Sequence, residues 1–156
     1  MPRYLEDFEI GETWTSRPFE MTQDDIVAYA RQYDPQLIHT DPERAAQGRF
    51  GSVIASGWQV AALSMRLFVE SGGYGDTPMV GLGIDELRWR KPVRPGDVLT
   101  VTREVVGVER SKSRPQFGTI RTRVSVGNQN GEVVMTLVTL GQVPTRDGHA
   151  GATRPD

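Results

Sequence analysis

The segment from Ser56 to Ser71 (SGWQVAALSMRLFVES) constrains the fold of this chain more than any other part. It places apolar residues at helical spacing on almost every side, and Gly72-Gly73 follows it as a stop signal. A helix without a polar face is buried on most sides. The rest of the chain must therefore supply a layer of structure that covers this helix.

The second half of the chain predicts that layer as four strands. Apolar and β-branched residues concentrate over 79–89, 98–108, 117–126 and 132–143. Turn signals separate these runs at Pro92 to Asp97 and at Asn130-Gly131. The last run is apolar on both faces, so it should lie inside the sheet. Strands joined by turns favour an antiparallel sheet, and together with the helix they predict an α+β fold in which the sheet wraps around the helix.

The first half of the chain predicts two more helices. Thr22 can cap a helix whose apolar residues follow at helical spacing until Pro35 ends it. Asp41 precedes Pro42 and fits the N-cap of a short second helix better than it fits chemistry. With 156 residues, the chain fits one domain over 1–144. The polar segment 145–156, which contains His149, is predicted to be a flexible tail.

Composition limits the chemistry. The chain has no cysteine and two histidines, which excludes thiolate nucleophiles and three-histidine zinc sites, so no metal site is expected. With a net charge of −2, the chain lacks the excess of basic residues that is typical of nucleic-acid-binding proteins. No apolar run reaches ~18 residues, and the acidic N-terminus lacks an apolar signal core, so we expect a cytoplasmic protein without a membrane span.

A carboxylate and an imidazole stand five residues apart in the segment Tyr33 to Pro42 (YDPQLIHTDP). A loop stiffened by Pro35 and Pro42 lies between two predicted helices. It can hold Asp34 and His39 so that both side chains contact the same water molecule. Such a pair can deprotonate that water or return a proton to a leaving hydroxyl. Spacing alone leaves a structural alternative, in which Asp34 caps a helix or turn and His39 is a hydrogen-bonded loop histidine.

Two further features are candidate binding elements. Ser56-Gly57-Trp58 begins the buried helix, where backbone N–H groups have no partner within the helix. Because glycine lets a ligand come close to the backbone, these N–H groups can form an oxyanion hole for a carbonyl oxygen. The alternative is that these residues simply begin the helix. Basic residues further along the chain can contact the phosphate groups of a ligand, and the candidates are Arg88, Arg90 and Lys112. The alternative is that they lie at the ends of strands and only contact solvent.

Three segments, in the same order and over roughly residues 5–143, resemble the MaoC-like dehydratase family, which includes the R-specific enoyl-CoA hydratases. The first is Asp34 to Pro42 with Ala45 and Ala46 after it, the second is Phe50 to Gly57 (FGSVIASG), and the third is Arg90 to Asp97 (RKPVRPGD). The chain departs from the family pattern at Tyr33, where many members have Gly, at Gln36, which stands in place of Asn, and at Leu37, which stands in place of Pro. Gln36 can still hydrogen-bond in the substrate site, although its longer side chain need not orient the same partner.

The resemblance implies a hot-dog fold, usually dimeric, and an acyl-CoA hydratase/dehydratase. It implies that Asp34 and His39 hold the water that is added to a 2-enoyl-CoA, and that the Gly57 N–H binds the thioester oxygen. The R configuration of the product also comes from the resemblance. Ser56, Trp58 and Gln36 are then candidate substrate contacts, and Trp58 is large enough to narrow an acyl tunnel. No cofactor is expected, because coenzyme A is part of the substrate.

Two other functions remain open from the sequence. A hot-dog acyl-CoA thioesterase would direct water at the thioester carbonyl, and it would release free thiol. A non-catalytic acyl-CoA-binding module would bind acyl-CoA without turnover.

Overall fold

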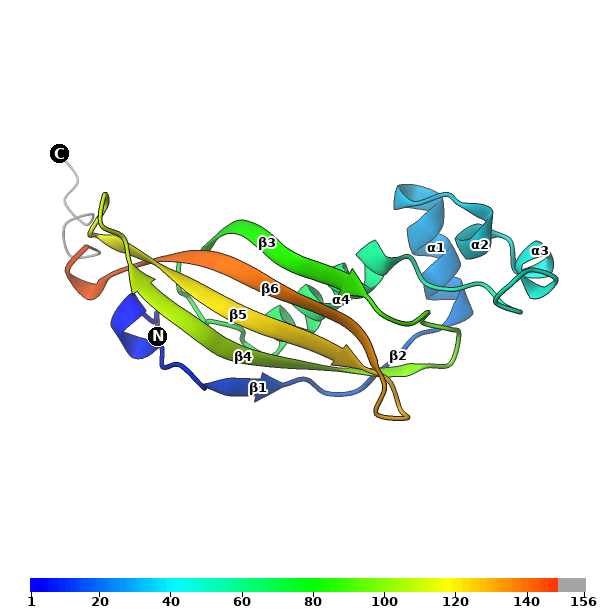
Figure 1. Cartoon of the computed structure of the whole chain (residues 1–156), viewed down its shortest axis with the longest axis horizontal. Coiled ribbons are helices and arrows are strands. Elements are labelled where there is room, and N and C mark those ends of the chain that lie inside the picture. Colours follow the sequence, from blue (N-terminus) through cyan, green and yellow to red (C-terminus); the bar gives the residue numbers. More distant parts are fainter. Residues whose placement is uncertain (149–156) are drawn as a thin grey trace.

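A computed structural model describes residues 1–148 as a sheet with one long helix on its face and three short helices beyond one end (Figure 1). In chain order the elements are η1 (Leu5–Asp7), β1 (Thr13–Thr15), β2 (Phe19–Glu20), α1 (Gln23–Tyr33), α2 (Leu37–Thr40), α3 (Pro42–Ala46), α4 (Gly57–Glu70), β3 (Val80–Trp89), β4 (Val98–Arg110), β5 (Phe117–Gly127) and β6 (Val133–Pro144). The predicted α+β class, with an antiparallel sheet and a central helix, is confirmed.

The sheet has the strand order β1-β4-β5-β6-β3, and β2 pairs with β4 beside β1. All pairings are antiparallel. Strand β6 lies between β5 and β3, which confirms its predicted interior position. Strand β3 is an edge strand, and its pairing with β6 contains two register shifts.

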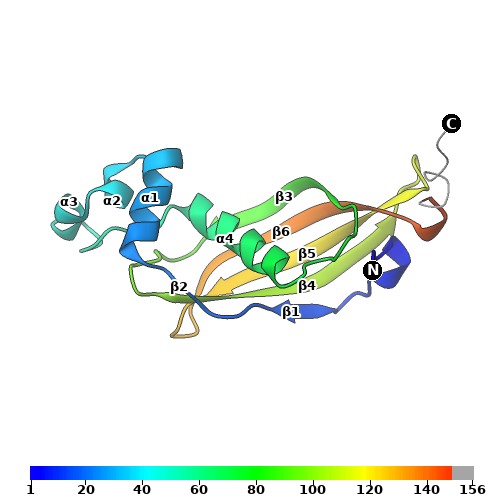
Figure 2. The same ribbon diagram turned by 180° about the vertical axis from the view of Figure 1, so that it is seen from behind.

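Helix α4 crosses one face of this sheet, as the view from behind shows (Figure 2). Its buried residues repeat at helical spacing and form one stripe: Gln59, Val60, Leu63, Ser64, Leu67 and Phe68. The strands below alternate, so that Leu99, Val101, Val124 and Val126 point into the same core. Arg121 and Arg123 of β5 point to the opposite, exposed face, as their alternation predicts.

The other side of α4 differs from the prediction that this helix is buried on most sides. Trp58 is 55 % exposed, Met65 is 48 % exposed and Val69 is 62 % exposed. The sheet packs against one stripe of the helix and does not enclose it within a single chain. These apolar side chains therefore lie on the protein surface.

The N-terminal half confirms two predicted helix starts and adds elements that the sequence did not indicate. Thr22 accepts a hydrogen bond from the Asp25 N–H at the start of α1, and Asp41 accepts one from the Arg44 N–H at the start of α3. The predicted loop around His39 contains the four-residue helix α2, and the short strands β1 and β2 were not predicted.

Strand β6 ends at the predicted domain boundary, Pro144. Thr145 is nevertheless fully buried, and Arg146 forms an ion pair with Asp7. The rest of the predicted tail, 149–156 with His149, lies outside the described residues. Within residues 1–148, no helix is both long and apolar enough to cross a membrane.

Candidate active site

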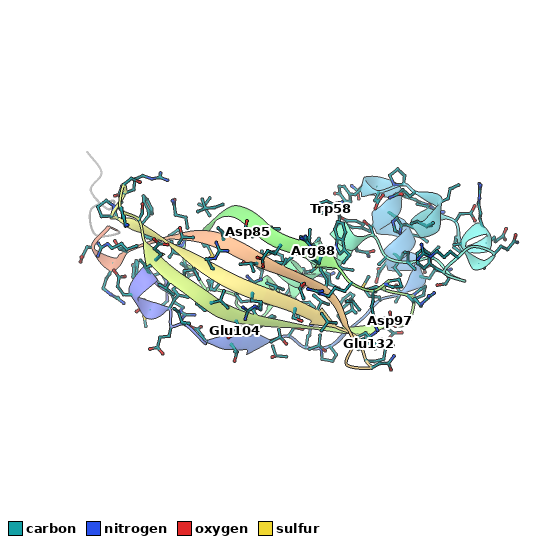
Figure 3. The ribbon with its side chains drawn as sticks, viewed as in Figure 1. Trp58, Asp85, Arg88, Asp97, Glu104 and Glu132 are labelled. Carbon is teal, nitrogen blue, oxygen red and sulfur yellow. The ribbon has the colours of Figure 1, made fainter. Side chains whose placement is uncertain are left out.

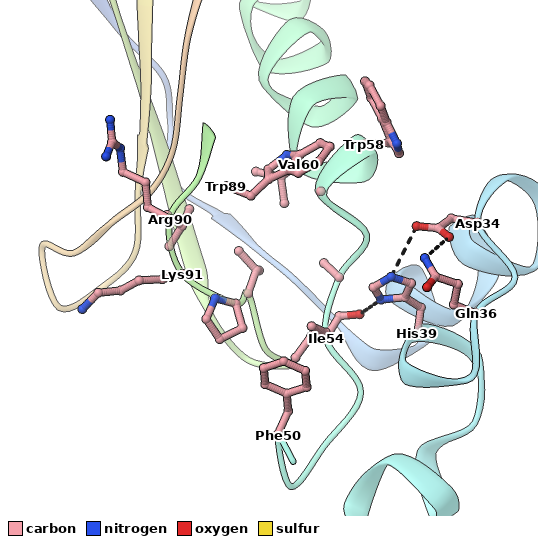
Figure 4. Close-up of a pocket in the computed structure, with 15 residues that line it drawn as sticks. Asp34, Gln36, His39, Phe50, Ile54, Trp58, Val60, Trp89, Arg90 and Lys91 are labelled. Carbon is pink, nitrogen blue, oxygen red and sulfur yellow. Dashed lines mark hydrogen bonds and ion pairs between the residues drawn. The ribbon is translucent and has the colours of Figure 1, made fainter. Parts of the chain in front are cut away.

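A cavity of about 380 Å³ lies where α2, the start of α4 and the end of β3 meet (Figure 4). Its polar residues are Asp34, Gln36 and His39 on one side and Arg90 and Lys91 on the other, and apolar side chains make up most of the rest. The local sequence explains this meeting point. Pro35 follows α1 and cannot continue it, so the chain turns and places α2 beside the irregular segment that leads into α4, where the Ile54 N–H donates to the Ile38 carbonyl.

Asp34 is the C-terminal capping residue of α1, and its carboxylate is held from two sides. The Gln36 Nε2 donates to Oδ1 at 2.7 Å, and the Ser56 Oγ donates to Oδ2 at 2.7 Å. These hydrogen bonds, first that from Gln36 and then that from Ser56, lower the pKa of Asp34 below its ordinary value. Asp34 is therefore an ionised, oriented carboxylate with acceptor capacity left for a further donor.

His39 comes from α2 and is only 5 % exposed. Its Nδ1 lies 2.6 Å from the carbonyl oxygen of Ile54. A carbonyl oxygen can only accept, so Nδ1 carries the hydrogen of this bond. The other ring nitrogen, Nε2, is consequently the one that faces Asp34 and is available for proton transfer.

The two groups meet with Nε2 of His39 at 3.3 Å from Oδ2 of Asp34 (Figure 4). When the imidazole is neutral, both of these atoms are acceptors, and a donor such as water can satisfy both. When the imidazole is protonated, the pair is a direct ion pair. This arrangement can hold a water molecule, take one of its protons and return it. The prediction that one short segment brings Asp34 and His39 together is therefore confirmed as geometry.

Gly57 occupies the first position of α4 and lines the cavity, so its N–H has no partner within the helix. The indole of Trp89 lies directly against this glycine, because a Cβ built on Gly57 would come within 2.5 Å of three of its ring atoms. Trp89 also packs edge-to-face on Trp58, with ring centroids 5.1 Å apart. Sequence reasoning missed Trp89, although its place between two basic residues just before the Pro92 turn put it at the end of a strand.

The other predicted substrate contacts have different positions. Trp58 lines the cavity but is half exposed, at the start of α4 between the sheet and α1 (Figure 3). Gln36 also lines the cavity and binds Asp34. Ser56 has no exposed surface, its hydroxyl donates to Asp34, and it is not among the residues that line the cavity, so in this structure it supports the carboxylate.

The three predicted phosphate contacts do not lie together. Arg90 lines the cavity, and its Nε donates to the Thr136 hydroxyl at 3.0 Å. Arg88 lies on β3 outside the cavity lining, where its guanidinium donates to the Leu87 carbonyl (Figure 3). Lys112 belongs to the turn between β4 and β5, at the opposite end of the sheet from α2 (Figure 1). Lys91, which was not selected, lines the cavity and pairs with Glu132.

Comparison with known proteins gives consistent matches. The model of the MaoC like domain family matches residues 7–128. The 3-hydroxyacyl-thioester dehydratase Z of Mycobacterium tuberculosis is 34 % identical over 108 residues, which cover 68 % of this chain and 72 % of that protein. The crystal structure of the MaoC-like dehydratase from Rhodospirillum rubrum has a TM-score of 0.82 at 38 % identity and covers 92 % of this chain and 98 % of that one. The unliganded R-hydratase PhaJ1 from Pseudomonas aeruginosa has a TM-score of 0.69 at 25 % identity, with 92 % of this chain and 86 % of that one covered.

Proposed function

Since this chain belongs to the MaoC-like domain family and has its hot-dog fold, we propose that it adds water reversibly to a 2-enoyl-CoA thioester. The family is one of hydratases and dehydratases. The observation that carries the specific proposal is the position of Asp34 Oδ2, 3.3 Å from His39 Nε2 on the cavity wall. A hydro-lyase needs such a pair, because it must move a proton to or from both water and carbon.

In the hydration direction, water held by the pair attacks C3 of the enoyl chain. One proton of that water passes to the pair, and a proton is delivered to C2, so the product contains all atoms of substrate and water. Negative charge develops on the thioester oxygen before C2 is protonated. The Gly57 N–H, at the positive end of the α4 dipole, is the proposed donor to that oxygen.

Coenzyme A enters the proposal as part of the substrate, and no metal or redox cofactor takes part in it. Arg90 and Lys91 lie across the cavity from Asp34 and His39 (Figure 4). Of the predicted phosphate contacts, Arg90 is the one whose position supports this role. Lys91 joins it as a candidate, whereas Arg88 and Lys112 lie outside the cavity lining.

An absorbance assay of the purified protein with a panel of 2-enoyl-CoA esters tests the function. Loss of the conjugated-alkene absorbance without release of thiol is the expected result. Release of free coenzyme A would instead indicate a thioesterase. Saturable binding of the esters with no turnover would indicate a non-catalytic binding module. Either outcome would overturn the proposal.

We expect syn addition that yields the R-3-hydroxyacyl-CoA. Asp34 and His39 lie on the same cavity wall, so water and the returning proton approach the alkene from one side. The R configuration is supported by the similarity to a solved R-hydratase. Chiral chromatography of the product and the reaction in deuterated water are the measurements, and an S product or anti addition would contradict the mechanism.

Short or medium acyl chains are the expected substrates within that panel. A cavity of about 380 Å³, walled in part by the indoles of Trp58 and Trp89, leaves little room for a long chain. Efficient turnover of long-chain esters alone would be compatible with the proposed hydration. It would contradict the prediction that the two indoles limit the length of the acyl chain.

A homodimer is the expected assembly. Apolar side chains are exposed on both α4 and the edge strand β3; they are Trp58, Met65, Val69, Val80, Leu82 and Ile84. An exposed edge strand with apolar side chains is a pairing surface unless it is covered. Sedimentation should give about twice the chain mass of 17.3 kDa, and Ile84→Lys should lower it. A monomer at micromolar concentration would contradict this prediction.

A further inference from the structure

Ser56 connects the two parts of the proposed site. It is the N-capping residue of α4, directly before Gly57, and it has no exposed surface. A serine at this position ordinarily accepts a hydrogen bond from an N–H of the first helical turn. The Ser56 side chain makes no such bond, and its hydroxyl donates instead to Oδ2 of Asp34 at 2.7 Å, across 22 positions of the chain. This serine therefore holds the proposed catalytic carboxylate in place of capping its own helix.

The oxygen that Ser56 binds is the one through which Asp34 meets His39. The Nε2 of His39 lies 3.3 Å from Oδ2, while Gln36 donates to the other oxygen, Oδ1, at 2.7 Å. Two donors, one for each oxygen, fix the plane of the carboxylate. Gln36 is exposed, so water can replace its contact, whereas the Ser56 hydroxyl is shielded from solvent. Ser56 is consequently the donor that determines where Oδ2 lies relative to the imidazole.

The same orientation of Ser56 leaves the first turn of α4 without a side-chain cap. Among residues 1–148, no carbonyl oxygen or side chain accepts from the Gly57 N–H. An uncapped first turn keeps its partial positive charge available for a ligand. Because Ser56 is joined to Gly57 by a peptide bond and to Asp34 by a buried hydrogen bond, it links the carboxylate to the N–H proposed for the thioester oxygen.

We propose that Ser56 is a positioning residue for the hydration, whose hydroxyl holds Oδ2 of Asp34 against His39 and in register with the Gly57 N–H. The inference rests on the proposed function. Water must lie on the carboxylate and the imidazole while the thioester oxygen lies at Gly57, so a shift of one part relative to the other misaligns the water and C3. Ser56 is absent from the cavity lining, so it acts through Asp34 and not on the substrate.

Kinetics of Ser56→Ala test this role. Its kcat should fall about 10- to 100-fold, the effect of losing one hydrogen bond to a charged group, with little change in KM. Ser64→Ala is the matched control, because Ser64 is a buried serine of the same helix whose hydroxyl donates to the Ala61 carbonyl, and its kcat should be normal. In an Asp34→Ala background, where no carboxylate remains to be held, Ser56→Ala should cost no more than about 2-fold. A normal kcat in Ser56→Ala, or its full loss repeated in that background, would overturn the proposal.

A titration of the Asp34 carboxyl by carbon-13 NMR does not depend on turnover. The hydrogen bonds from Gln36 and then from Ser56 lower the pKa of Asp34, so Ser56→Ala should raise this pKa toward its ordinary value. The acid limb of the kcat/KM profile should move to higher pH in the same variant, because the ionised carboxylate is then lost at higher pH. The Ser64→Ala control should leave both unchanged.

Few groups around Asp34 complicate this titration. Its neighbour from α2 is His39, and its neighbour from α1 is Tyr29, whose pKa is raised above all by burial, so the phenol stays neutral. Arg90 and Lys91 lie across the cavity and remain charged throughout (Figure 4). Repeating the titration in a His39→Ala background removes the coupling to the imidazole, and the serine variant should still raise the pKa of Asp34 there.

The two measurements separate the failure of this inference from the failure of the proposed function. A parent protein that hydrates no enoyl ester would contradict the function, while the titration would still decide whether Ser56 holds Asp34. An unchanged pKa of Asp34 in Ser56→Ala would overturn the positioning role even in an active hydratase. If Ser56→Ala did not fold, an ordinary pKa of Asp34 in the parent protein would overturn it as well.

Discussion

Replacement of Asp34 by Asn or of His39 by Ala is expected to lower the turnover of a 2-enoyl-CoA about 10²–10⁴-fold each, the usual contribution of a general acid–base group. Asn keeps the shape of Asp34 but cannot accept a proton. Ala at position 39 removes the Nε2 that lies 3.3 Å from the carboxylate. Steady-state kinetics on the purified variants measure the effect, with circular dichroism to verify folding.

The double variant is informative because both groups act on one water molecule. Its loss should be close to that of the more damaging single variant and far below the product of the two. Asp41→Asn serves as the matched control on the same segment. Asp41 accepts from the Arg44 N–H at the start of α3, and Asn is an equally good cap, so this variant should keep both stability and turnover. Near-normal turnover of either site variant would remove that residue from the proposed chemistry.

The sequence predicted the parts of the fold that depend on neighbouring residues. Thr22 and Asp41 begin helices as their side chains require, and the alternation of β5 predicts its buried face. The pairing of Asp34 with His39 could be predicted for the same reason, because the two residues are five positions apart and Pro35 makes the chain turn between them. Asp34 does cap α1, as the structural alternative held, and it also faces the cavity.

Contacts between segments far apart in the sequence could not be predicted from neighbouring residues. Strands β1 and β2 have three and two residues and exist through their pairing with β4, more than 75 positions away. Trp89 reaches Gly57 only because β3 ends beside the start of α4. Lys112 illustrates the reverse error, because a basic residue was selected without knowing that its turn lies at the far end of the sheet.

The sequence itself indicates that Arg103 is buried. Leu99, Val101 and Val105 alternate in β4, and Arg103 occupies the same register. A period of two places all four side chains on one face, and that face is the core. A charged residue in a buried register indicates a special environment, because isolated charges are expensive to bury.

Substitution of Gly57 is the second change with a large expected effect. In Gly57→Ala the new Cβ would come within 2.5 Å of the Trp89 ring, so the indole or the start of α4 must move. Either movement disturbs the N–H that is proposed to stabilise the thioester oxygen. Loss of one such donor typically costs about 10²–10³ in turnover, and Gly57→Val should be at least as damaging because its side chain also obstructs the approach of the thioester.

Two further variants separate packing from chemistry. Gly127→Ala is a matched control, since its Cβ would meet only the Glu132 carbonyl at an ordinary 3.7 Å, and turnover should be unchanged. Trp89→Ala removes the ring that the Gly57 substitution would strike. If Gly57 matters because the thioester must approach its N–H, then Gly57→Val combined with Trp89→Ala should remain far slower than Trp89→Ala alone. If the combined variant instead matched Trp89→Ala, the glycine would be needed only to accommodate the indole, and the oxyanion role of its N–H would be wrong.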